Sequence, residues 1–132
     1  MNIKEEIIKK TNVGFTAAND FKIIELTNEK AVIEYEVKES GLNPYNIVHG
    51  GMLYALADTT AGVLSCMSGR PSLTISASIN YLKAANCKKV IATAKILKEG
   101  KNIGYYEVEI HDENKNLLTV VSVNMFFINN DK

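Results

Sequence analysis

Residues that could perform chemistry gather near the middle of the chain, in the run His49-Gly50-Gly51 and at Asp58. The two glycines head a stretch whose apolar spacing predicts a helix over residues 49–67. At a helix N-terminus the backbone N–H groups lack intrahelical partners, and glycine leaves them open to a ligand atom. A carbonyl oxygen placed there would be polarised, as in an oxyanion hole. The alternative is a purely structural role, in which the glycine pair only turns the chain into the helix.

Asp58 is the only charged residue between Gly50 and Gly69. A solvated helix face normally carries many charges, so we expect this face to be covered by a second subunit. A carboxylate partly removed from water becomes more basic and is a candidate base. It could equally be a structural acid that accepts hydrogen bonds from a partner chain. Its helical neighbours, apart from Tyr54, are small: Gly51, Ala55, Ala61, Gly62 and Ser65.

The rest of the sequence predicts the elements that position these residues. A short amphipathic helix, a loop, a hairpin and a second loop precede the long helix, and four strand-like runs follow it. Their expected ranges are 3–10, 14–20, 21–27 with 31–37, 39–48, and then 72–82, 90–97, 103–110 and 117–128. The last four runs are joined by short polar segments typical of antiparallel hairpins. The order predicts an α+β architecture in which one long helix packs on a six-stranded sheet.

Size and composition exclude several classes of function. The 132 residues suit one domain, residues 1–132, and Lys plus Arg (15) balance Asp plus Glu (15), which argues against a basic nucleic-acid-binding surface. No apolar run approaches the roughly 20 residues of a membrane span, and the charged N-terminus lacks a signal-peptide core, so a cytoplasmic protein is expected. Cys66 and Cys87 are too few for a zinc cluster, so we expect no metal site and two reduced, buried thiols.

The segment NPYNIVHGGMLYALADTTAG, residues 43–62, resembles the signature of the hotdog-fold acyl-CoA thioesterases, in particular the phenylacetic-acid-degradation (PaaI-like) type. Residues 78–85, SINYLKAA, resemble the strand that follows in this family. The resemblance runs from Gly14 through the last strand. It implies a hotdog fold, in which a curved antiparallel sheet wraps a long helix, and protomers that pair edge to edge as homodimers or associate as homotetramers.

The resemblance also implies roles for individual residues at a protomer interface. The Gly50 N–H, helped by Gly51, would polarise the thioester carbonyl. Asp58 from the other chain would be the general base or the nucleophile, and the sequence leaves both roles open. Asn43 would orient the water or the thioester.

Two further residues take supporting roles from the same resemblance. His49 would hold the loop geometry rather than act as a base, and Thr74 would help to place the water. Relatives usually carry Gly where this chain has Asn46, and often Pro where it has Ala84. Asn tolerates left-handed geometry, so the loop is expected to survive the first difference.

Substrate binding is the least constrained part of the prediction. Tyr54 and Leu53, with residues of the partner chain, would form the pocket wall. Lys83, together with the other cations Arg70, Lys88 and Lys89, could meet coenzyme A phosphates, although each taken alone is more simply a solvated surface residue.

The favoured function is hydrolysis of an aryl- or medium/long-chain acyl-CoA to the free acid and coenzyme A, with no metal or bound cofactor. The alternative is a non-catalytic acyl-CoA binding or sensing module, although a regulator would be expected to carry a DNA-binding domain and residues 1–13 are too short for one. An acyl-thioester dehydratase of the same fold is disfavoured because the chain has no His-Phe-x-x-x-Pro segment.

Overall fold

The computed structural model describes residues 1–128. The expected order of a short helix, two strands, a long helix and four strands is confirmed, with a short helix and a 3₁₀ turn in addition. The elements are α1 (Ile3–Thr11), α2 (Gly14–Ala18), β1 (Lys22–Leu26), β2 (Lys30–Glu36), the 3₁₀ turn η1 (Glu39–Gly41), α3 (Gly50–Cys66), β3 (Ser72–Tyr81), β4 (Lys89–Glu99), β5 (Ile103–Asp112) and β6 (Leu117–Phe127).

The six strands form one antiparallel sheet in the order β1-β2-β4-β5-β6-β3. Three hairpins are confirmed, but the connection of residues 83–89 is not a fourth one, because β3 pairs with β6 and not with β4. This connection instead passes the N-terminal end of α3, where the Val48 N–H donates to the Ala85 carbonyl at 3.0 Å. As a result β3 forms the edge of the sheet opposite β1.

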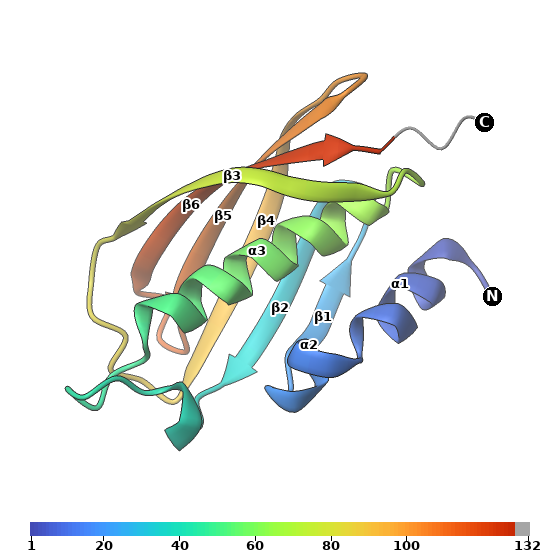
Figure 1. Ribbon diagram of the computed structural model, residues 1–132. Helices are drawn as coiled ribbons and strands as arrows, with labels where there is room; N and C mark the ends of the chain where they lie inside the picture. The colour runs from blue at the N-terminus through green and yellow to red at the C-terminus, as the bar shows by residue number, and fades with distance from the viewer. Residues whose placement is uncertain (129–132) are drawn as a thin grey trace.

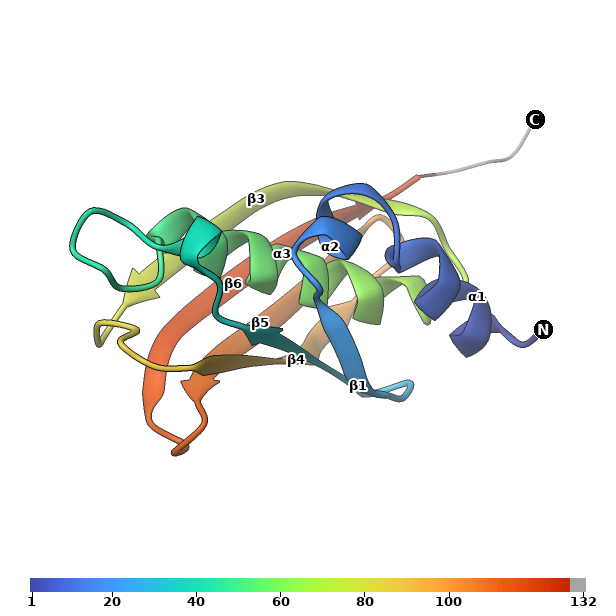
Figure 2. The ribbon, with the colours of Figure 1, turned by 90° about the horizontal axis from the view of Figure 1, so that it is seen from below.

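Helix α3 lies across the concave face of the curved sheet (Figures 1 and 2). The side chains of Leu53, Leu56 and Leu64 are buried between the helix and the strands. This is the arrangement expected of a hotdog fold, with the long helix wrapped by the sheet. None of the helices within residues 1–128 has the length and apolar character needed to cross a membrane.

The N-terminal segment differs from the prediction in one place. Residues 14–20 were expected to form a loop, but Gly14–Ala18 form the short helix α2. One and a half turns carry too few residues for a periodic apolar pattern, and the Thr16 hydroxyl stabilises the turn by donating to the Val13 carbonyl at 2.8 Å. Helix α1 is confirmed, and Ile7 anchors it as its one buried residue.

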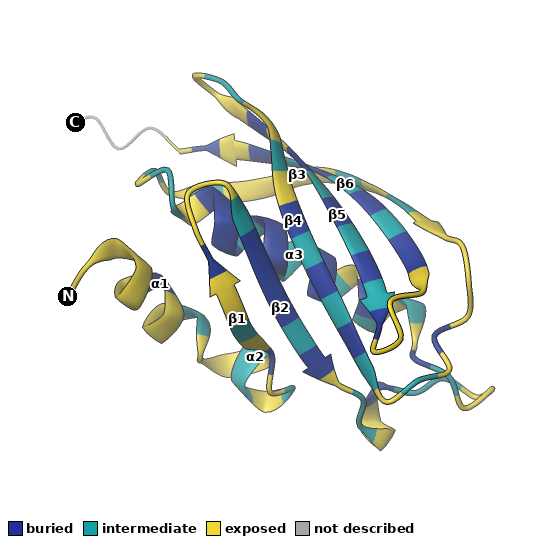
Figure 3. Ribbon diagram, turned by 180° about the vertical axis from the view of Figure 1, so that it is seen from behind, coloured by how far each residue is buried: buried dark blue, intermediate teal, exposed yellow. Residues whose placement is uncertain are grey.

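The core lies between the helix and the concave face of the sheet. In β4, β5 and β6 buried residues alternate with partly exposed ones (Figure 3), as the strand period of two requires. In β2, Ile33 and Tyr35 are fully buried. In β5, Tyr106 is buried and Tyr105 is exposed, so one of these two neighbouring rings packs inside.

Replacing Leu56 by Ala should remove the contact that seats α3 on the sheet. Leu56 is fully buried, so we expect a loss of about 2–5 kcal/mol in the free energy of unfolding, measured by urea denaturation. Leu97→Ala, at a strand position that is 52% exposed, is the control and should cost less than about 1 kcal/mol. Equal losses in the two variants would contradict this assignment of the core.

Candidate active site

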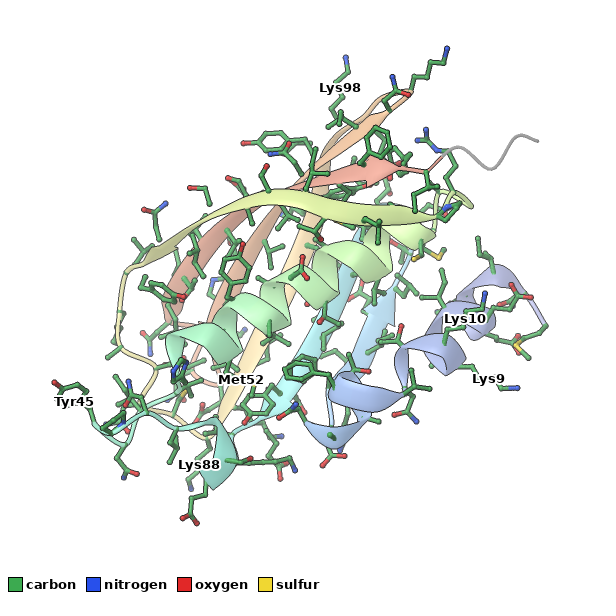
Figure 4. The ribbon with its side chains drawn as sticks, in the orientation of Figure 1. Lys9, Lys10, Tyr45, Met52, Lys88 and Lys98 are labelled. Atoms are coloured by element: carbon green, nitrogen blue, oxygen red, sulfur yellow. The ribbon has the colours of Figure 1, made fainter. Side chains whose placement is uncertain are left out.

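The loop that leads into α3 is held by Asn43. The Asn43 side-chain oxygen accepts hydrogen bonds from the backbone N–H of Tyr45 at 2.9 Å and of Ile47 at 3.3 Å. Asn46 has φ +65°, so the left-handed geometry expected at this position is present. Tyr45 points away from the body of the molecule at the tip of the loop (Figure 4). The oxygen of Asn43 is thus engaged by its own loop, and its amide nitrogen is the group left for a ligand.

His49 caps the N-terminus of α3. Its Nδ1 atom accepts a hydrogen bond from the Gly51 N–H at 2.8 Å. A Cβ atom on Gly51 would lie 2.9 Å from this nitrogen, so the second glycine is required by the close approach of the imidazole ring. Because Nδ1 accepts, the ring proton resides on Nε2. This geometry fits the expectation that His49 holds the loop.

Gly50 presents a free backbone donor. Within residues 1–128 no hydrogen bond is formed by its N–H, whereas the Gly51 N–H is taken by His49. On the other side of the residue, the Tyr81 hydroxyl donates to the Gly50 carbonyl at 2.8 Å. A Cβ atom on Gly50 would lie 3.1 Å from the Tyr81 ring, so the packing against β3 favours glycine here. Tyr81 was not among the site residues expected from the sequence.

Asp58 lies two turns along the same helix and is half-buried. The Thr74 hydroxyl on β3 donates to its carboxylate at 2.6 Å and also lies 3.2 Å from the Met125 sulfur. The structure therefore brings together Asp58 and Thr74, two of the residues expected at the site, which lie 16 residues apart in the sequence.

The residues of α3 around Asp58 differ in exposure more than the helical spacing indicated. Ala61 and Ser65 were expected on a face open to a partner, but both are fully buried within the chain. The fold of the chain itself covers them, and the Ser65 hydroxyl lies 2.7 Å from the hydroxyl of Ser72 at the start of β3. Gly51 and Tyr54 do lie on the exposed side.

The two residues expected to act on the carbonyl group, Gly50 and Asp58, do not meet within one chain. Eight residues separate Gly50 from Asp58, and at a rise of 1.5 Å per residue they lie roughly 12 Å apart along the helix. A single carbonyl group must come within about 3 Å of both an oxyanion donor and the attacking group. One copy of α3 therefore cannot apply both Gly50 and Asp58 to the same carbonyl.

Two hollows adjoin these residues. The first, called here the loop pocket, has a volume of about 270 Å³ and is lined by Asn43, Gly50, Tyr81 and Lys83 among others. The second, called here the helix groove, has a volume of about 340 Å³ and runs along the C-terminal half of α3. A larger hollow of about 790 Å³ lies between α1 and β1, but none of the expected site residues lines it.

The helix groove begins next to Asp58 and Thr74. Met125, which contacts the Thr74 hydroxyl, lines its near end, and Gly62 lies on its floor. A Cβ atom on Gly62 would meet only the Met125 methyl group, at 4.0 Å, so the groove is open above this glycine. Val13, which precedes α2, and Phe15 within α2 also line the groove.

The cysteines are not both buried, contrary to expectation. Cys66 is exposed in the last turn of α3 and Cys87 is half-buried, and neither forms a disulfide. Burial raises the pKa of the Cys87 thiol to about 11, so it remains protonated at neutral pH. Within residues 1–128 no three His, Cys, Asp or Glu side chains are grouped closely enough to hold a metal ion.

Comparison with known proteins shows that the sequence of the chain is similar to those of thioester-cleaving enzymes. The family model of the thioesterase superfamily matches residues 45–119. The chain is 28% identical over 111 residues to the 1,4-dihydroxy-2-naphthoyl-CoA hydrolase of Listeria monocytogenes, covering 82% of this chain and 90% of that enzyme. It is 30% identical over 89 residues to the acyl-coenzyme A thioesterase PaaI of Escherichia coli, covering 67% of this chain and 64% of that enzyme.

The fold is shared with the solved structure of E. coli PaaI. The structure of the E. coli PaaI protein from the phenylacetic acid degradation operon matches with a TM-score of 0.88 at 22% identity, covering 97% of both chains. This likeness confirms the expected hotdog fold.

Substitution of His49 tests its role as a helix cap. His49→Ala leaves the Gly51 N–H without its acceptor, so we expect a loss of about 0.5–2 kcal/mol in the free energy of unfolding. His49→Asn, which places another capping acceptor at this position, should lose less. Thermal unfolding of both variants measures the difference, and equal losses would show that the Nδ1 contact does not stabilise the helix.

Proposed function

This chain belongs to the thioesterase superfamily and is a thioester hydrolase, and we propose that it cleaves acyl-CoA with Asp58 of one protomer and the Gly50 N–H of another. The observation that carries this proposal is the ordered Asp58–Thr74 pair, with the carboxylate held at 2.6 Å by a hydroxyl. An acyl-CoA binder needs no such group, whereas hydrolysis needs a base or a nucleophile.

The proposed reaction uses a carboxylate, a water molecule and a backbone N–H. Acting as a general base, Asp58 takes a proton from water while the water oxygen attacks the thioester carbon. The negative charge develops on the carbonyl oxygen beside the Gly50 N–H, which stabilises it. Collapse of the tetrahedral intermediate breaks the C–S bond, and the thiolate of coenzyme A takes up the proton that Asp58 took from water, which restores the carboxylate. These steps require no metal or bound cofactor.

Direct attack by Asp58 is the other route. The carboxylate would then attack the thioester carbon, the C–S bond would break to release the thiolate of coenzyme A, and the mixed anhydride formed on Asp58 would be hydrolysed by water in a second step, which frees the acid and the carboxylate. In both routes the Thr74 hydroxyl supports the reaction by fixing the carboxylate, and in the first route it would also hold the water. Asn43 contributes its free amide nitrogen to the loop pocket.

A homodimer supplies both halves of the site, which a single helix separates by roughly 12 Å. The exposed edge strand β3 carries Thr74 near its start and Tyr81 at its end. If two copies of β3 pair antiparallel across a two-fold axis, the Thr74 end of one strand lies beside the Tyr81 end of the other. Asp58 of one protomer then approaches the Gly50 of its partner. A tetramer would be a pair of such dimers.

The two hollows accommodate the two parts of the substrate in this proposal. The loop pocket of one protomer, with Lys83 exposed at its rim, receives the coenzyme A side of the thioester. The helix groove of the partner receives the acyl group, whose carbonyl carbon lies beside the partner's Asp58. Tyr54, exposed one turn from both Gly50 and Asp58 on the helix, contributes to the wall of the site. An aryl or medium-length acyl group fits a groove about 12 Å long, the distance from Asp58 to Cys66 along α3.

Deletion of the Gly50 N–H tests the oxyanion site. Gly50→Pro removes this donor at the first helical position, which tolerates proline, and His49 already has the extended backbone that precedes proline (φ −59°, ψ 134°). We expect kcat for acyl-CoA, measured by thiol release, to fall about 10²–10³-fold. Gly50→Ala introduces the same Cβ beside Tyr81 but keeps the N–H, so its loss should be below about tenfold. Equal activity of the two variants would refute the role of the N–H.

Mixed dimers extend this experiment to the subunit arrangement. Asp58→Asn should be as inactive as Gly50→Pro, because the base or nucleophile is lost. When the two inactive variants are mixed and refolded together, half of the dimers are mixed and each contains one intact site. About a quarter of the wild-type activity should therefore return. If Asp58 and Gly50 acted from the same chain, mixing would restore nothing.

Filling the helix groove tests the position of the acyl group. Gly62 lies roughly 6 Å beyond Asp58 along α3, and an extended carbon chain advances about 1.2 Å per bond. Gly62→Leu should therefore lower kcat/KM about tenfold or more for acyl groups longer than about five carbons. It should leave acetyl-CoA within about twofold. Gly62→Ala is the control, and an unchanged chain-length profile in Gly62→Leu would place the acyl group elsewhere.

A further inference from the structure

We propose that Tyr81 is a positioning residue that aims the Gly50 N–H at the thioester oxygen. This inference rests on the proposed function, since it assigns a residue that orients the oxyanion donor. The Tyr81 hydroxyl donates to the Gly50 carbonyl at 2.8 Å. The edge of its ring lies 3.1–3.3 Å from the position of a Cβ atom on Gly50, so the ring packs directly on the bare α-carbon.

Gly50 is the first residue of α3, so the helix holds its carbonyl and a contact from outside can add to that support. Glycine has the least restricted backbone of all residues, so the direction of the Gly50 N–H is set by what holds the two peptide groups on either side of its α-carbon. These two peptides carry four polar groups. They are the His49 carbonyl, the Gly50 N–H, the Gly50 carbonyl and the Gly51 N–H.

Three of these four groups have partners within the described part of the chain. The His49 carbonyl accepts from the N–H groups of Met52 at 2.9 Å and Leu53 at 3.2 Å. The Gly51 N–H donates to the His49 ring, and the Gly50 carbonyl accepts from Tyr81. The fourth group, the Gly50 N–H, is left for substrate. Of the side chains in this set, only that of Tyr81 comes from outside the loop and helix.

The surroundings of Tyr81 suit a permanent donor. Its ring lines the loop pocket beside Gly50, and burial raises the pKa of its hydroxyl above the ordinary value. The hydroxyl therefore stays protonated across the neutral range and keeps its bond to the carbonyl. The same strand holds Thr74 against Asp58, so β3 fixes both the oxyanion donor and the carboxylate of each protomer.

The test is Tyr81→Phe, which keeps the packing of the ring and removes only the donor. We expect kcat for acyl-CoA to fall about three- to tenfold, the range for one neutral hydrogen bond, with KM within about twofold of wild type. Tyr105→Phe, on an exposed ring of β5, is the matched control and should leave both constants unchanged. An unchanged kcat, or a change confined to KM, would overturn the assignment.

A double variant separates positioning from a general structural role. If Tyr81 acts through the Gly50 N–H, then Tyr81→Phe should have no further effect on kcat in a Gly50→Pro background, where that donor is absent. An additional three- to tenfold loss in this background would overturn the inference while leaving the proposed oxyanion site intact. Full activity of Gly50→Pro alone would instead refute the proposed function itself.

Discussion

The burial of one side of α3 against the concave face of the sheet decides where the candidate site residues lie. Leu53, Leu56 and Leu64 fix both the rotation and the position of the helix. With the rotation fixed, Asp58 is directed to the flank beside β3, where the Thr74 hydroxyl reaches it. With the position fixed, the helix N-terminus meets the end of the same strand, where Tyr81 reaches Gly50. A regular helix also holds these two places at a constant separation.

That constant separation makes one chain insufficient for the proposed chemistry. A flexible loop could bring a donor and a base together within a chain. The segment from Gly50 to Asp58 is a regular helix, so it cannot bend to bring its two ends together. The edge strand β3 carries exposed apolar side chains, including Leu73 (62%) and Ile75 (56%). Natural proteins usually protect such an edge. In the proposed dimer the partner's β3 protects it, and the same pairing completes both active sites.

Much of the architecture could be predicted because its signals are local. The change from a strand period to a helical period located α3, and the small polar connections located three of the hairpins. The run His49-Gly50-Gly51 and the later Asp58 drew attention to the correct helix. Asn46 adopts the left-handed backbone that its residue type allows.

The errors and omissions share a cause, which is that they depend on contacts between distant segments. Nothing in the sequence near Tyr81 indicates that its hydroxyl reaches a carbonyl 31 residues earlier. The burial of Ala61 and Ser65 depends on how the sheet packs around the helix. The spacing of residues along the helix does not reveal this packing. The connection of residues 83–89 has the composition of a hairpin turn, but β3 pairs with β6, which is far from it in the sequence. The second glycine is explained only by the ring of His49 folding back over it.

The strand order has a consequence for folding during synthesis on the ribosome. Strand β3 leaves the ribosome well before its strand neighbour in the described sheet, because β6 is built from residues 117–127. Until these residues are made, Thr74 and Tyr81 lie on a strand that lacks this partner, and such long-range pairing is slow to form. The exposed apolar side chains of β3, Leu73 and Ile75 among them, stay unprotected during this interval, which favours association of incomplete chains.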